Sequence, residues 1–142
     1  MRRFLAAALV LALAGPVHAA DKIQATLYKS PQCGCCEGHA DHLRANGFDV
    51  KTIETHDLPL IMQRHGVTPE IEGCHTIEVG GYVVEGHVSA AMIKRLLAER
   101  PAIKGISLPG MPQGSPGMSG RKVAPFKIYT ITDGAPQLYA VE

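Results

Sequence analysis

The chain has 142 residues with a formal net charge of +1 at neutral pH, no tryptophan, and aromatic residues at 5% of its positions. This length suits one domain of ordinary size. The balanced charge leaves no basic surplus to neutralise phosphates, and the few aromatic residues offer little surface for stacking bases. The composition therefore indicates no nucleic-acid partner.

The first 20 residues predict an export signal. The basic start MRRF is followed by the apolar run LAAALVLALAG and by VHAA, whose small residues suit cleavage after Ala19 or Ala20. The apolar run is shorter than the ~20 residues that a membrane-spanning helix needs. We therefore expect residues 1–20 to be removed, and residues 21–142 to form one periplasmic domain without membrane contact.

Seven elements are predicted next in the chain, from the alternation of apolar and polar residues in strands and from capping residues and glycine stops in helices. They are a strand at 22–29, a helix from about 35 to 47, a strand at 48–54, a helix at 57–66, two strands at 75–87 around a turn at Gly80-Gly81, and a helix at 89–101. The order β-α-β-α-β-β-α predicts an α/β fold of the thioredoxin-like type, with helices packed on a central sheet.

The last part of the chain has a different composition. Residues 107–125, SLPGMPQGSPGMSGRKVAP, predict a Gly/Pro/Met-rich loop that is too long for a passive connection. The methionines Met111 and Met118 are soft donors that suit copper(I), or they cover an apolar patch. Residues 126–142 then predict a C-terminal β-hairpin that turns at Asp133-Gly134.

The cysteines carry most of the chemical information. Cys33 and Cys36 form a C-x-x-C pair where a strand meets a helix, and a helix N-terminus favours the thiolate, as a dithiol oxidoreductase requires. Cys35 between them argues against that use, because a third thiol invites misdirected exchange. A framework of structural disulfides is less favoured, because bridges within CGCC would close only very short loops.

A soft metal accounts better for three crowded thiols. The spacing does not match the two separated pairs of a zinc site, whereas neighbouring sulfurs on Cys35 and Cys36 can bridge two adjacent copper(I) ions. In a thioredoxin-like fold, Cys74 precedes the third strand and packs against the C-x-x-C turn. The residues therefore favour copper binding by four thiols, with redox exchange second.

The remaining polar residues are less informative. His75 adjoins Cys74 and is a candidate ligand, although alternation along a strand would turn the two side chains to opposite sides. Glu85 is predicted to be a lone carboxylate without a partner. The other candidate histidines are predicted to lie on the surface or to be structural, namely His39, His42 and His65 in the first group and His87 in the second.

On these motifs the chain resembles CopG, a family of small exported copper-resistance proteins long catalogued as a domain of unknown function. The matching segments YKSPQCGCCEGH, GCHTIEVGGYVVEGHV, IKRLLAERPAIKGISLPGMPQGSPGM and the final hairpin cover nearly all of the chain after the signal. The resemblance implies a thioredoxin-like fold, periplasmic residence and copper bound through thiols. By position, the implied ligands are Cys33, Cys35, Cys36 and Cys74, to which we add His75.

The sequence thus predicts a periplasmic protein of copper tolerance that holds several copper(I) ions as a thiolate cluster. Interconversion of copper(I) and copper(II) is a further hypothesis, and the expected partners are copper ions and periplasmic copper-handling or efflux proteins. The alternative is a thiol-disulfide oxidoreductase in which Cys33 attacks and Cys36 resolves.

Overall fold

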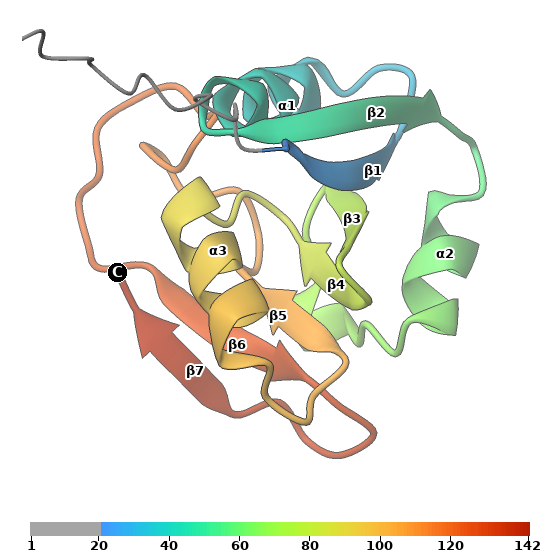
Figure 1. Cartoon of the computed structure of the whole chain (residues 1–142), viewed down its shortest axis with the longest axis vertical. Helices are drawn as coiled ribbons and strands as arrows, with labels where there is room; N and C mark the ends of the chain where they lie inside the picture. The colour runs from blue at the N-terminus through green and yellow to red at the C-terminus, as the bar shows by residue number, and fades with distance from the viewer. Residues whose placement is uncertain (1–20) are drawn as a thin grey trace, which may run out of the picture.

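The computed structural model describes residues 21–142, so the predicted export signal at residues 1–20 lies outside the described residues. In this part of the chain, three α-helices accompany a single seven-stranded sheet (Figure 1). The strands are β1 Ile23–Lys29, β2 Phe48–Glu54, β3 His75–Val79, β4 Tyr82–Glu85, β5 Gly105–Ser107, β6 Lys127–Ile131 and β7 Leu138–Val141. The helices are α1 Gly34–Ala45, α2 Leu58–Arg64 and α3 Ala90–Glu99, with a 3-10 turn η1 at Pro69–Ile71.

The predicted element order is confirmed from β1 to α3, and with it the α/β class. Strand β1 pairs in parallel with β2 and antiparallel with β3, and β3 pairs antiparallel with β4. The turn between β3 and β4 uses Gly80 and Gly81 at φ angles of 56° and 86°, as a two-residue turn with two left-handed residues requires. The more specific likeness to thioredoxin stays a prediction.

The sheet extends beyond the predicted elements through β5, which the sequence did not indicate. Strand β5 pairs in parallel with β4 and antiparallel with β6, and so joins the C-terminal hairpin of β6 and β7 to the main sheet. Gly105 permits this pairing, because a Cβ atom there would lie 1.8 Å from the carbonyl oxygen of Val83. The sheet order is therefore β2-β1-β3-β4-β5-β6-β7.

The apolar core lies mainly on one face of the sheet. Leu43 of α1 and Ile93 of α3 pack in the same buried cluster as Ile77 of β3. A smaller cluster on the opposite face contains Val83 and Ile131. No helix of residues 21–142 has the length and apolar character needed to cross a membrane.

Candidate metal centre

The four cysteines meet at one end of the sheet, although Cys74 is far from the others in sequence. Cys33 immediately precedes α1, after a short turn that follows β1, and Cys35 and Cys36 lie in the first turn of the helix. Because β3 runs antiparallel to β1, its first residues lie beside the end of β1, and Cys74 immediately precedes β3. The four sulfur atoms all lie within 4.8 Å of one another. The predicted proximity of Cys74 to the CGCC segment is confirmed.

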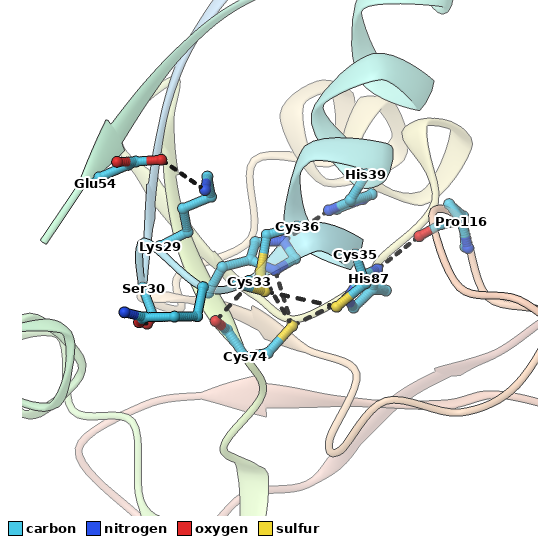
Figure 2. The surroundings of a disulfide bond; sticks show 12 residues. Lys29, Ser30, Cys33, Cys35, Cys36, His39, Glu54, Cys74, His87 and Pro116 are labelled. Atoms are coloured by element: carbon cyan, nitrogen blue, oxygen red, sulfur yellow. Dashed lines mark hydrogen bonds and ion pairs between the residues drawn. A yellow bond between two sulfur atoms is a disulfide. The ribbon is translucent and has the colours of Figure 1, made fainter. Parts of the chain in front are cut away.

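Two of these cysteines are joined in the structure. Cys33 and Cys36 form a disulfide with a Cα–Cα distance of 5.5 Å, while Cys35 and Cys74 are free thiols. The sulfur of Cys35 lies 3.6 Å from that of Cys33, and the sulfur of Cys74 lies 3.5 Å from that of Cys36 (Figure 2). The described form is therefore oxidised, and reduction would give four thiols in one place.

The environment of Cys74 makes its thiol less acidic than an exposed thiol. Burial and the neighbouring Cys35 raise the pKa of the Cys74 thiol to about 12. Cys74 is therefore protonated at neutral pH, and a metal ion has to displace that proton.

His39 is fully buried, and the prediction of an exposed position was wrong. It shares a face of α1 with Cys36, Ala40 and Leu43, a helical spacing typical of a core face. Nε2 of His39 lies 2.8 Å from the carbonyl oxygen of Val88, and Nδ1 lies 2.7 Å from Nε2 of His75. The apolar spacing around His39 was the available signal for its burial.

His75 and His87 both contact Cys74. Nδ1 of His75 lies 3.3 Å from the sulfur of Cys74, and Nε2 of His87 lies 3.0 Å from it. Strand alternation did not separate His75 from Cys74, because Cys74 lies in a bend before β3 begins. His87 was predicted to be only structural, and no sequence pattern links its loop between β4 and α3 to Cys74.

His42 is less solvated than predicted, whereas His65 is partly exposed. His42 is half-buried, and its Nε2 accepts a hydrogen bond from the backbone N–H of Ala90 at 3.2 Å. His65 follows α2 and lies 2.9 Å from a carboxylate oxygen of Glu78. Both lie outside the groups of candidate metal ligands that the described residues form.

The buried histidines around Cys74 are neutral at physiological pH. Burial lowers the pKa of His39 to about 3 and holds the pKa of His75 well below its ordinary value. Burial also lowers the pKa of His87. Neutral imidazoles keep one nitrogen lone pair each, which is the form that binds metals.

Glu85 at the end of β4 is not a lone carboxylate, contrary to prediction. One of its oxygens accepts a hydrogen bond from the N–H of Gly73 at 3.0 Å, and the other accepts one from the hydroxyl of Thr76 at 2.7 Å. Glu85 is fully buried, and burial raises its pKa to about 8. Glu85 therefore fastens the segment that carries Cys74 to the neighbouring strand.

The Gly/Pro/Met-rich loop packs against the start of α1. A Cβ atom on Gly117 would lie 2.4 Å from the backbone nitrogen of His39, so the loop approaches the helix closely. The carbonyl oxygen of Pro116 lies 2.6 Å from Nδ1 of His87 (Figure 2). Met111 is exposed and Met118 is partly exposed, and their role as copper donors stays a prediction.

The chain is similar to a family of unknown function and to two solved structures. Residues 71–118 match a family described as a protein of unknown function, DUF411. No curated protein matches the chain. Two solved structures, described as copper resistance protein copG Form 1 and Form 2, each match with a TM-score of 0.78 and 36% sequence identity, over 85% of this chain and 98% of theirs. This chain belongs to the family of the copper resistance protein CopG.

Proposed function

We propose that the chain is an exported copper-binding protein of copper tolerance, which holds copper(I) as a thiolate cluster on Cys33, Cys35, Cys36 and Cys74. The observation that carries the proposal is the convergence of these four sulfurs within 4.8 Å. The names of the related structures, copper resistance proteins, support the choice of metal. The periplasmic location rests on the export signal predicted at residues 1–20.

The donor set fits a soft ion of low coordination number. Thiolates favour copper(I) over harder ions, and a thiolate can bridge two copper ions. The adjacent cysteines Cys35 and Cys36 cannot easily bind one ion together, so several bridged ions fit the set better than one. The N-terminus of α1 then reduces the cost of gathering several negative sulfurs.

Copper(I) binding by all four sulfurs requires the Cys33–Cys36 disulfide to be reduced first. Two electrons and two protons from a thiol reductant convert the bond into two thiols. Each thiol loses its proton when it binds copper(I), so loading the cluster releases protons. In the same cluster, we propose that copper(I) passes one electron to an external one-electron acceptor to become copper(II), and that a one-electron donor reverses the step. We also propose that periplasmic copper-handling or efflux proteins exchange copper with the cluster.

An anaerobic copper(I) titration of the reduced protein against a chromogenic chelator, followed by native mass spectrometry, tests this proposal. We expect several copper ions per chain, and fewer in the Cys74→Ser variant. The unreduced protein is the matched control, and its capacity should fall because two of the four sulfurs are in a disulfide. Binding of at most one copper ion, unchanged by Cys74→Ser, would contradict the cluster.

A thiol-disulfide oxidoreductase is the second candidate function, favoured by the disulfide at the N-terminus of α1. Cys33 is partly exposed and Cys36 is fully buried, as expected for an attacking and a resolving thiol. An insulin-reduction assay tests this function. Turnover that is lost in Cys33→Ser would support thiol-disulfide exchange as the function in place of copper binding. We expect no turnover above the rate of a free dithiol.

A further inference from the structure

We propose that Cys74, His75 and His87 form a second metal site, for a divalent ion of borderline softness such as copper(II), which shares Cys74 with the thiolate cluster. The choice of copper rests on the proposed function, whereas the site itself rests on geometry. The three ligand atoms lie within 4.8 Å of one another, and both rings are fully buried. They come from the start of β3 and from the loop between β4 and α3.

The hydrogen bond to Pro116 determines which nitrogen of His87 is free. A backbone carbonyl oxygen only accepts hydrogen bonds, so Nδ1 of His87 must carry the hydrogen that it donates to Pro116 at 2.6 Å (Figure 2). In a neutral imidazole the other nitrogen then has no hydrogen. The lone pair on Nε2 of His87 therefore faces the sulfur of Cys74 at 3.0 Å.

The hydrogen bonds of His39 determine in turn which nitrogen of His75 is free. Nε2 of His39 donates to the carbonyl oxygen of Val88 at 2.8 Å, so Nδ1 of His39 is an acceptor. Nε2 of His75, which lies 2.7 Å from that acceptor, must be the donor. Nδ1 of His75 therefore carries a lone pair, and it faces the sulfur of Cys74 at 3.3 Å.

The hydrogens at Cys74 are too few for the nitrogen lone pairs that face it. Two bare nitrogens, on His75 and His87, face one thiol that has one hydrogen to donate. The Cys74 thiol can therefore satisfy only one of two buried lone pairs, and an unsatisfied buried polar atom is costly. A metal ion that replaces the thiol hydrogen would accept electron pairs from all three atoms at once.

The donor types identify the class of ion. Two imidazole nitrogens and one thiolate form the trigonal set that is typical of copper(II)-thiolate centres, and the set also binds cobalt(II) and zinc(II). The four sulfurs suit copper(I) instead. Sharing Cys74 therefore puts a preferred site for each copper oxidation state side by side. The second site needs neither Cys33 nor Cys36, so it remains when those two residues form a disulfide.

A variant without the thiolate cluster tests the second site separately. In the mature chain with Cys33→Ser, Cys35→Ser and Cys36→Ser, Cys74 is the one remaining thiol. Anaerobic titration with cobalt(II), which does not oxidise thiols, should give one ion per chain and a thiolate-to-cobalt charge-transfer band in the near ultraviolet. Adding His87→Gln should weaken binding by roughly tenfold or more. His65→Gln is the matched control and should change nothing, because His65 pairs with Glu78 away from the site.

Nitrogen-15 spectroscopy of the wild-type protein, with the disulfide intact, gives a test that needs no substitution. Zinc(II) should shift the resonances of Nδ1 in His75 and Nε2 in His87 and leave their partner nitrogens almost unchanged. Unchanged resonances, or shifts confined to other histidines, would overturn the second site, as would the absence of the charge-transfer band. The copper(I) capacity of the reduced wild-type protein is measured separately, so failure of either site is distinguishable from failure of the other.

Discussion

Cys74 belongs to both proposed sites, and a neighbouring carboxyl group determines its position. Glu85 accepts hydrogen bonds from Gly73 and Thr76, on either side of Cys74. A Cβ atom on Gly73 would lie 2.7 Å from the Cα of Gly86, so the two segments are also in close backbone contact. Glu85 therefore positions the sulfur of Cys74 indirectly, through its hydrogen bonds with Gly73 and Thr76.

We predict different effects for two substitutions of Glu85. Glu85→Gln keeps an acceptor for the N–H of Gly73 and an amide that can donate to the Thr76 hydroxyl oxygen, so it should cost about 1 kcal/mol or less. Glu85→Leu leaves both Gly73 and Thr76 without their partner and should cost about 2 to 4 kcal/mol in the free energy of unfolding. Urea denaturation measures both, and equal stability of the two variants would show that Glu85 does not fasten the Cys74 segment.

At the scale of elements, the loop at residues 107–125 contacts the site through Pro116 and Gly117. We predict that Gly117→Ala lifts this loop, because the added Cβ would meet the backbone of His39 at 2.4 Å. Gly110→Ala is the matched control: its φ of 68° is also left-handed, but no atom lies within 4 Å of the added Cβ. Both variants should lose about 1 to 2 kcal/mol from backbone strain, and Gly117→Ala about 1 to 3 kcal/mol more from the clash.

Thiol labelling gives a second readout for the same pair of variants. Lifting the loop should expose the first turn of α1, so Cys35 should react faster with an aromatic disulfide reagent in Gly117→Ala than in Gly110→Ala. Equal labelling rates and equal stabilities would contradict the close packing of the loop on α1.

The elements that follow from local patterns could be predicted from the sequence, and those that depend on distant partners could not. The helix predicted at 89–101 begins with a capping residue: the hydroxyl oxygen of Ser89 accepts a hydrogen bond from the N–H of Met92 at 3.2 Å. Strand β5 was missed because three residues, Gly105–Ser107, carry no period, and their strand conformation depends on pairing with β4 and β6.

The candidate site also contains residues that could be predicted from the sequence and residues whose contribution depends on distant packing. The four thiols could be predicted, because their types and the order of elements bring them together. The contribution of His87 could not be predicted, because it depends on how two irregular segments pack. His39 was an avoidable error, since its spacing from Cys36 and Leu43 follows the buried face of α1.

At the scale of the whole molecule, burying neutral histidines makes the free energy of unfolding depend on pH. The pKa of His39 falls to about 3 in the folded protein, and those of His75 and His87 are also lowered from 6.5. As pH falls below 6.5, these side chains gain protons in the unfolded chain before they do so in the folded chain, so stability is lost. Glu85 acts in the opposite direction: its pKa rises from 4.5 to about 8, so its contribution is full at low pH and is lost as pH rises toward 8.

These opposing contributions predict that the metal-free protein is most stable at about pH 6.5 to 7.5. Between pH 4.5 and 6.5, unfolding takes up protons on His39, His75 and His87 and releases one from Glu85, and the uptake on the histidines is the larger of the two. The free energy of unfolding should therefore fall by about 1 kcal/mol or more per pH unit as the solution becomes acidic. Urea denaturation at half-unit pH intervals, with a chelator present, measures this dependence.

In Glu85→Gln the optimum should become a plateau that extends to higher pH, because the group that titrates near 8 is gone. An optimum that stays sharp in Glu85→Gln, or a stability that does not change between pH 7 and 5, would contradict the assignment of these buried groups.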